Sequence, residues 1–404
     1  MNDLRDRLRI ARAAARKATD SDPKESIEEL EKKIKEALRQ YKEFTLKLKK
    51  DHPKLAVLVS DDPMTLSTVQ SMLKPDQALL QYMLLPDRGW MFLTTRDELI
   101  SLDLGVGRQQ LDPLIQQYRW QLQTPAATRG FTLDPTIVQR AVMADAPREL
   151  SRLLLQPVLD KLAGKRHLTI IPNGDLHFLP FAALPVDGHY LVERLTLSTL
   201  SSASLLAHTR PVTVPLHPRL LALANPVRTG LAPLPGTEAE AQAIGTHYPD
   251  PDKRLYFRER AQRSILVGQD LRGWNLHLAV HGQAGAMNTT RLQFSDGDLT
   301  LADVWNLYLD DAPLVVLSAC ETALGEQLGG DEVVSLANGF IFAGAQALVS
   351  SLWPVPDEPT RALMEEFYRQ RNQGPAAALA AAQRALIKDG HDPYHWAGFI
   401  VAGW

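Results

Sequence analysis

Two reactive side chains, His281 and Cys320, each follow a short run of strand-forming residues. The stretch NLHLAV is followed by His281 and Gly282, and the stretch LVVLSA by Cys320, the only cysteine of the chain. The two residues lie 39 positions apart, which is enough chain for one hairpin and one crossover helix. In an open parallel sheet the carboxyl ends of neighbouring strands meet at one edge. We therefore expect the two side chains to face the same crevice.

These residue types fit nucleophilic catalysis by a cysteine. A thiol with a pKa of about 8.5 is mostly protonated at neutral pH. A neighbouring imidazole lowers that pKa, or takes the proton during the attack and later returns it to the leaving group. Glycine lets the backbone approach a substrate closely, so the N–H groups of Gly282 and Cys320 are candidates for an oxyanion hole. The alternative is that Cys320 fills space in a core and that His281 is structural.

Both strands belong to a C-terminal segment in which strand and helix patterns alternate. Apolar runs such as RLLALA, NLHLAV, LVVLSA and ALVSSLW are separated by helical patterns, among them TEAEAQAIGTHY, LTLADVWNLYL, GDEVVSLANGFIFAG and DEPTRALMEEFYRQ. Strands that are apolar throughout are buried on both faces, as in parallel sheets with helical crossovers. Residues 211–404 therefore predict an open, mostly parallel α/β sheet flanked by helices.

The preceding segments have a different pattern. Residues 52–210 contain ALLQYMLLPDRGWMFLTTRDELISLDL, which predicts a meander of short strands, and the helical pattern LDPLIQQYRWQLQT. The proline-rich stretch TRPVTVPLHPR predicts a linker to the C-terminal segment. Residues 1–51 are charge-dense, and their apolar residues from Ile27 to Leu48 are spaced three and four apart, which predicts a helical arm. The arm either binds a partner or docks on its own domain.

Composition and missing motifs exclude several classes of function. With 45% hydrophobic and 23% charged residues and a net charge of -3, the chain has the composition of a globular protein without affinity for nucleic acid. One cysteine cannot form an internal disulfide, and the N-terminus has no apolar signal segment, so we expect a cytoplasmic protein. No stretch approaches about 18 consecutive apolar residues, the length of a membrane span. No phosphate loop or dinucleotide fingerprint is present, and no third ligand cluster joins His391, Asp392 and His395, so we expect no cofactor and no metal.

Several ordered motifs are similar to those of one family. The stretches IIPNGDLHFLPFAAL, HLAVHG, LVVLSACETALGE, GGDEVVSLANGFIFAGAQALVSSLWPVPD and DPYHWAGFIVAGW together resemble the CHAT domain of bacterial cysteine proteases related to caspases and separases. The resemblance covers about residues 150–404. It implies a clan CD peptidase with a caspase-like sheet, in which His281 is the base and Cys320 the nucleophile. It also implies that the backbones of Gly282 and Cys320 supply the oxyanion hole.

The resemblance also implies how the remainder is organised. Separases and related CHAT enzymes carry a caspase-like pseudo-domain before the active domain, and residues 52–210 fit that place. Relatives of the bacterial TPR-CHAT type often begin with TPR repeats, whereas residues 1–51 contain no full repeat. Ser318 stands where caspases have a glutamine, two positions before the cysteine, which argues against a true caspase. Relatives act in bacterial antiviral defence or regulated cell death, and the resemblance implies such a role here.

Acidic residues at the predicted strand ends suggest the substrate preference. An unpaired carboxylate in a pocket would favour a basic residue at the cleavage site, and the resemblance to separases points the same way. Asp357 is the first candidate for the pocket wall and Asp331 the second, while Glu321 either lines the pocket or braces the nucleophile loop. The alternative for Asp357 is to cap the helix that follows it. Trp353 either lines the pocket or packs in the core.

The sequence thus predicts a cysteine endopeptidase that cuts a specific protein substrate after a basic residue through a His281–Cys320 dyad. The alternative is a non-catalytic CHAT scaffold or adaptor that binds a partner through the N-terminal helices. The presence of both dyad residues favours the enzyme, because degenerate scaffolds usually lose one of them. The expected partners are a protein substrate and an activating protein bound by residues 1–50, without direct contact to nucleic acid or membrane.

Overall fold

A computed structural model describes most of the chain beyond residue 63. The described ranges are 64–123, 145–207, 217–283, 290–318, 326–327, 333–334 and 336–403, with a few helical positions around Arg39. The chain divides into two compact units, residues 1–63 and residues 64–404. The predicted N-terminal arm lies in the first unit and, apart from those helical positions, outside the described residues. No helix among the described residues is both long and apolar enough to cross a membrane.

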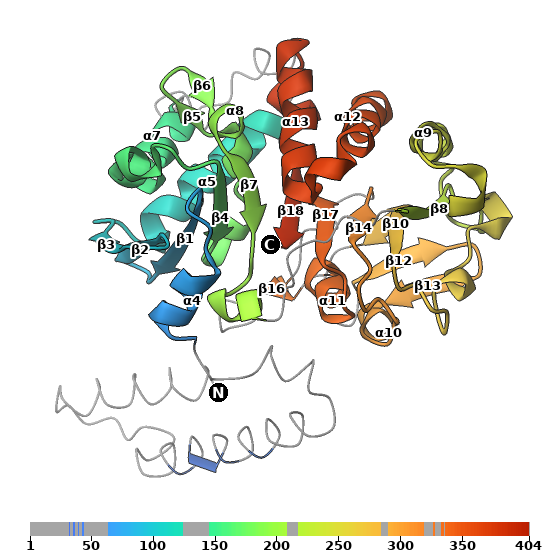
Figure 1. Cartoon of the computed structure of the whole chain (residues 1–404), viewed down its shortest axis with the longest axis horizontal. Coiled ribbons are helices and arrows are strands. Elements are labelled where there is room, and N and C mark those ends of the chain that lie inside the picture. The colour runs from blue at the N-terminus through green and yellow to red at the C-terminus, as the bar shows by residue number, and fades with distance from the viewer. Residues whose placement is uncertain are drawn as a thin grey trace, which may run out of the picture. The chain divides into compact units, whose positions relative to one another are not determined.

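The second unit is built around one mixed sheet, whose strands follow one another across Figure 1. The order of its 11 strands is β3 (Leu99–Asp103), β2 (Gly89–Thr94), β1 (Gln77–Leu84), β4 (His167–Ile171), β7 (Thr196–Thr199), β18 (Phe399–Gly403), β17 (Ala347–Ser351), β14 (Leu314–Leu317), β10 (Trp274–Ala279), β8 (Arg219–Ala224) and β9 (Lys253–Phe257). We call β1–β4 and β7 the N-terminal sheet half, and β8–β10, β14, β17 and β18 the C-terminal sheet half.

The parallel strands of the two sheet halves run in opposite directions. Strands β9, β8, β10, β14 and β17 are mutually parallel, and so are β1, β4 and β7. The last strand, β18, is antiparallel to β17 and parallel to β7, and so it reverses the direction between the halves. The carboxyl ends of the two sets of parallel strands therefore lie at opposite edges of the sheet.

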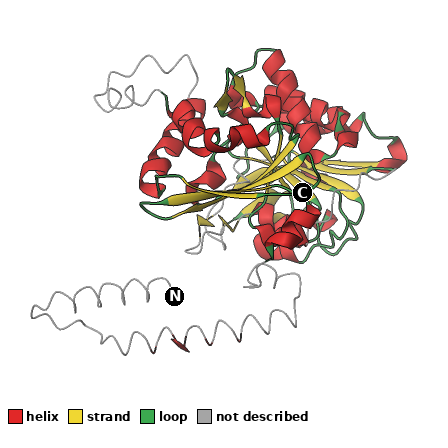
Figure 2. Cartoon of the chain, turned by 60° about the vertical axis from the view of Figure 1, so that its left-hand side comes forward, coloured by secondary structure: helices red, strands yellow, loops and turns green. Residues whose placement is uncertain are grey.

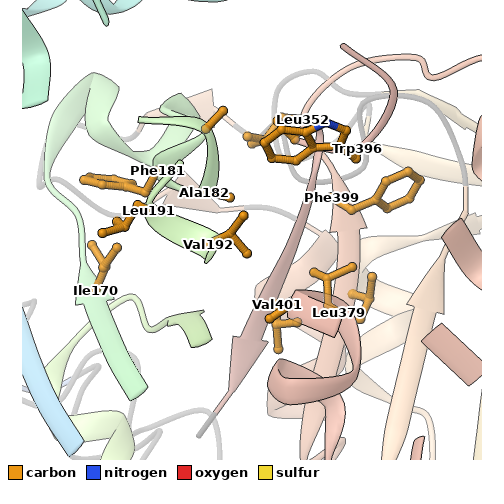
Figure 3. Packing of buried hydrophobic residues seen from close by; sticks show 14 of the residues in the cluster. Ile170, Phe181, Ala182, Leu191, Val192, Leu352, Leu379, Trp396, Phe399 and Val401 are labelled. Carbon is orange, nitrogen blue, oxygen red and sulfur yellow. The ribbon is translucent and has the colours of Figure 1, made fainter. Parts of the chain in front are cut away.

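The seam between the halves has little backbone pairing. Five residue pairs join β17 to β18, but a single pair, Thr199 with Ala402, joins β18 to β7. Apolar side chains from both halves line this seam, among them Ile170 and Phe181 on one side and Phe399 and Val401 on the other (Figure 3). A cavity of about 80 Å³ lies here, lined by residues of β4, β7, β17 and β18. The seam thus combines a single strand pair with apolar side chains from both halves.

Helices cover both faces of the sheet (Figure 2). Alternate residues of β8 assign the faces, because Leu220 and Ala222 belong to one apolar core, and Leu221 and Leu223 to another. Buried residues of α5, α7, α9, α12 and α13 contribute to the first core, and those of α10 and α11 to the second. In the described part of residues 64–404 the α-helices are α4 (Leu66–Met72), α5 (Arg108–Gln123), α7 (Ala146–Leu154), α8 (Leu191–Arg194), α9 (Pro235–Gly245), α10 (Leu301–Trp305), α11 (Leu336–Phe342), α12 (Asp357–Arg369) and α13 (Pro375–Lys388).

Within the ranges that the structure describes, short strands form three further small sheets outside the large one. They are β5 (Pro185–Val186) with β6 (His189–Tyr190), β15 (Glu326–Gln327) with β16 (Val333–Val334), and β11 (His281–Gln283) with β12 (Arg291–Phe294) and β13 (Gly297–Thr300). Strand β11 begins at His281, so the third of these sheets bears directly on the candidate site.

Most elements expected from the sequence are present. The antiparallel meander β1–β2–β3 is confirmed, as is the alternation of strands and helices after residue 218. Two predicted helices are shorter than expected. Only Leu301–Trp305 is helical in LTLADVWNLYL, whose first two residues are the last two of β13. In GDEVVSLANGFIFAG, β16 comes first and the helix begins at Leu336, because its valines favour extended backbone.

Candidate active site

His281 lies where the chain leaves the large sheet. Strand β10 ends at Ala279, and His281 begins β11, where it pairs with Gln293 of β12. Strand β14, which leads toward Cys320, is the parallel neighbour of β10, with Leu278 opposite Leu317. The prediction that the two strands are neighbours is confirmed, and the connection between them contains the expected hairpin, β12–β13, and the helix α10. Both strands deliver their following residues to the same edge of the sheet.

Three of the predicted site residues lie outside the described residues. The chain is described up to Ser318 after β14, and Cys320, Glu321 and Asp331 follow beyond it. Their predicted roles, including the backbone donor of Cys320, therefore stay predictions. Gly282 is described and lies in β11 beside His281, half-buried.

The imidazole of His281 is half-buried and makes a defined hydrogen bond. Its Nε2 lies 2.7 Å from the carbonyl oxygen of Ala232, in the loop that joins β8 to α9. A carbonyl oxygen only accepts, so Nε2 must carry the proton and donate. In the neutral ring this leaves the lone pair on Nδ1. His281 can therefore act as a base through Nδ1 while the Ala232 carbonyl holds the opposite nitrogen.

Trp353 and Asp357 follow the carboxyl end of β17, the strand next to β14. Asp357 is the first residue of α12 and is exposed, and Glu358 adds a second acid in that first turn. Its carboxylate lies directly against Gly236 of α9, where any side chain on Gly236 would collide with it. Carboxylates at a helix N-terminus interact favourably with the helix dipole, so this placement fits the helix-terminus alternative as well as a pocket wall.

Trp353 lies in the core instead of at the surface. Its side chain is 1% exposed, and its Nε1–H donates to the carbonyl of Tyr394 at 3.0 Å. Gly398 lies against the indole, and a Cβ there would come within 2.9 Å of the ring. The packing alternative describes this environment.

A second histidine, His277 in β10, is part of a buried polar network that the sequence did not reveal. The His277 Nε2 is 3.1 Å from a carboxylate oxygen of Glu240 in α9, and its Nδ1 is 3.2 Å from the hydroxyl of Tyr368 in α12. All three side chains are at most 2% exposed, and burial raises the pKa of Tyr368 well above its usual value. These contacts attach both helices to the strand that leads to His281. Among the described residues, no group of three potential ligands could hold a metal ion.

Taken together, the geometry is that of an α/β protein with His281 at the carboxyl edge of a parallel sheet, beside the strand that leads to its only cysteine. The CHAT domain family matches residues 145–404, more than half of the chain. The chain belongs to the CHAT domain family.

The similar proteins are much longer than this chain. Human tetratricopeptide repeat protein 28 is 36% identical over 109 residues, which are 26% of this chain and 4% of that protein. The mouse protein of the same name is 26% identical over 296 residues, 59% of this chain and 12% of that protein. The chain thus matches only a small part of the length of these relatives.

Solved structures of the Saccharomyces cerevisiae separase–securin complex share the fold. One, at 3.0 Å resolution, is 11% identical with a TM-score of 0.53 and covers 83% of this chain and 30% of that chain. Another, at 2.6 Å, is 10% identical with a TM-score of 0.52 and covers 87% and 31%. The predicted fold class, a caspase-like, mostly parallel sheet flanked by helices, is confirmed.

Proposed function

We propose that this chain is a cysteine endopeptidase in which His281 is the base and Cys320 the nucleophile. The observation that carries the proposal is the hydrogen bond from His281 Nε2 to Ala232, which leaves Nδ1 as the proton acceptor beside the strand leading to Cys320. Membership of the CHAT family and the separase-like fold support this class of activity.

In the proposed reaction Nδ1 of His281 takes the thiol proton as Sγ of Cys320 attacks the scissile carbonyl carbon. The N–H groups of Gly282 and Cys320 stabilise the oxyanion. The imidazolium keeps its Nε2–H bond to the Ala232 carbonyl and then gives the Nδ1 proton to the leaving amine. Water hydrolyses the resulting thioester, with His281 again as the base, and regenerates the thiol.

The proposed substrate is a protein segment with a basic residue at the cleavage site. Asp357 supports this preference, because its exposed carboxylate lies at the carboxyl edge of the same set of parallel strands as His281. Asp331 and Glu321 remain further candidates. The neighbouring structures hold a separase with a protein partner, securin, and we likewise propose that a protein partner controls this chain, through residues 1–50, in a defence or cell-death pathway.

The single cysteine makes a direct test possible. The rate of Cys320 alkylation by iodoacetamide is measured by mass spectrometry from pH 5 to 9 in the full chain and in His281→Ala. Fast labelling below pH 7 that is lost in His281→Ala supports an assembled dyad, because the thiolate is the reactive form. The same slow profile in both proteins, together with uncut peptides containing Arg or Lys, would contradict the proposal and favour the scaffold.

A further inference from the structure

Two strands beside β10 end in residues with unusual backbone conformations. Asn225 follows β8 with a φ of 48°, and Arg258 follows β9 with a φ of 56°. The last residues of these strands, Ala224 and Phe257, are paired, so Asn225 and Arg258 lie side by side. The left-handed conformation is unfavourable for most non-glycine residues, less so for asparagine than for arginine, and such conformations gather at functional sites. Contacts in the surroundings must hold both residues in place.

Both side chains meet on Glu238, in the first turn of α9. Asn225 Nδ2 donates to Glu238 Oε1 at 2.5 Å, and Arg258 donates to the same oxygen at 2.7 Å and to Oε2 at 3.3 Å. The hydrogen bond from Arg258 is the main reason that the pKa of Glu238 is below its usual value. Glu238 is therefore ionised at neutral pH, and it joins the ends of β8 and β9 to the start of α9.

Asn225 also closes the loop that contains Ala232. Its side-chain Oδ1 accepts a hydrogen bond from the backbone of Leu234 at 2.6 Å, across nine positions of chain. Its own N–H donates to the carbonyl of Ala279 at 3.2 Å, two residues before His281. Asn225 is 5% exposed. One buried side chain thus fixes both ends of the loop and attaches it to the strand that leads to His281.

The middle of the loop is attached to the small sheet that begins with His281. Arg228 donates to Asp298 of β13 at 2.6 Å, and Asp298 also pairs with Arg291 of β12 at 3.3 Å. Arg291 in turn donates to the side chain of Gln283 in β11 at 2.7 and 2.9 Å. The loop that carries the Ala232 carbonyl is therefore attached both to Ala279, which precedes His281, and to Gln283, which follows it.

We propose that Asn225 is a positioning residue for His281. With Glu238 and Arg258 it fixes the Ala232 carbonyl, which selects the tautomer with the proton on Nε2 and leaves Nδ1 as the proton acceptor. The catalytic part of this inference rests on the proposed function, but the tautomer does not. Without the carbonyl the ring exchanges its tautomers, and the imidazolium that pairs with a thiolate loses an acceptor.

The tautomer is read by NMR of ¹⁵N-labelled histidine in the full chain, with the His281 signals assigned from His281→Gln. The wild type should show a protonated Nε2 and an unprotonated Nδ1. In Asn225→Gly the two nitrogens should become mixed, and Cys320 labelling at pH 7 should slow about tenfold, a change of about 1.4 kcal/mol. Glycine accepts the left-handed backbone, so this variant isolates the loss of the side chain.

Two further variants sharpen the test. Glu238→Gln keeps the size of the side chain but removes its charge. It should shift the tautomer and the labelling rate in the same direction as Asn225→Gly, but less. Thr246→Ala removes a 2.6 Å hydrogen bond to Ala243 at the other end of α9 and should change neither readout.

The outcomes separate this inference from the proposed function. An unchanged Nε2 proton and labelling rate in folded Asn225→Gly and Glu238→Gln would overturn the positioning role while the dyad stands. If labelling is independent of His281 in the wild type, the peptidase fails, and the tautomer alone decides whether Asn225 positions the ring. Thr246→Ala acting like Asn225→Gly would reduce the effect to general helix stability and overturn the inference.

Discussion

Both sheet halves contain a set of parallel strands, but the residues that follow the carboxyl ends of these strands make different contacts in the two halves. In the C-terminal half Asn225 follows β8 and His281 follows shortly after β10. Asn225 binds the backbone of the loop whose Ala232 carbonyl accepts from the half-buried imidazole. In the N-terminal half the end of β1 is closed by Asn173, which follows β4 and whose Oδ1 accepts the backbone N–H of Leu84 at 2.8 Å. Asn173 is 9% exposed and also lies 3.4 Å from Arg108 of α5.

The comparison teaches that the fold brings the strand ends to one edge of the sheet, whereas the residues after the strands determine whether that edge is structural or functional. The same strand ends can present an imidazole at the edge or close the edge by hydrogen bonds to buried backbone. The difference leads to separable effects: substitutions in the C-terminal half should change thiol reactivity, and those in the N-terminal half should change stability.

The largest expected effect is that of His281→Ala. A positioned base contributes about 10²- to 10⁴-fold, so we expect Cys320 labelling near pH 6 to fall by about 100-fold or more. Because the ring is half-buried and donates a hydrogen bond to the Ala232 carbonyl, the free energy of unfolding should change by less than about 1 kcal/mol. Urea unfolding of the same samples checks the second value. A loss of reactivity that only accompanies unfolding would remove the contrast between the halves.

Asn173→Ala should give the opposite result. It leaves the buried N–H of Leu84 without its acceptor, which costs about 1–3 kcal/mol. Urea unfolding should show this loss, and Cys320 labelling of the folded variant should match the wild type. Asn173→Asp is the control, because its carboxylate keeps an acceptor for Leu84 and should retain most of the stability. Slow labelling in folded Asn173→Ala would show that the halves are coupled across the seam.

Tyr118→Phe removes a second buried hydrogen bond of the N-terminal half and should lower stability by a smaller amount. The Tyr118 hydroxyl, on α5, donates to the carbonyl of Ala183 at 2.6 Å, and its side chain is 5% exposed. Losing this bond should cost about 1 kcal/mol in thermal or urea unfolding, without any change in labelling. Tyr308, at 63% exposure, is the matched control, and Tyr308→Phe should be neutral. Equal effects of the two substitutions would mean that the buried hydroxyl adds nothing to the stability of the N-terminal half.

Sequence patterns predicted the features that each segment encodes by itself. LVVL and, after Arg219, LLALA are apolar throughout because β14 and β8 are buried on both faces, so their strands and their parallel arrangement were predictable. The position of His281 followed from the end of NLHLAV. The edge strand β9, KRLYF, was missed because its charged and half-exposed residues have no buried-strand pattern.

Features that depend on distant contacts were not predictable in the same way. The reversal between the halves depends on β18, the last strand, pairing with both β7 and β17. The contact of His281 with Ala232 uses a backbone carbonyl, which no side-chain pattern reports. The Asn225-Pro226 pair directly after β8 was the available sign of a special turn, because asparagine tolerates the left-handed conformation.

The smallest effect concerns a carboxyl group in the N-terminal half. Burial, and then repulsion from Asp175, raise the pKa of Asp112 on α5 to about 6, and nearby Arg108 opposes the shift. A raised carboxyl pKa means that the folded state prefers the protonated acid. Asp112 therefore costs nothing below about pH 4, and stability falls as the pH rises from about 4 to about 6.

Asp112→Asn cannot ionise, so its stability relative to the wild type should rise through that interval and stay constant above it. We expect a gain of about 1 kcal/mol at pH 7, well below the full value of the shift because the side chain is partly exposed to water. Urea unfolding at pH 4, 5, 6 and 7 measures it, with Asp97→Asn in the exposed β2–β3 turn as the control. A difference that is the same at every pH would assign the effect to packing instead of charge. If only Asp112→Asn gains stability and Cys320 labelling stays unaltered, removing this charge stabilises the N-terminal half without affecting the thiol of the C-terminal half.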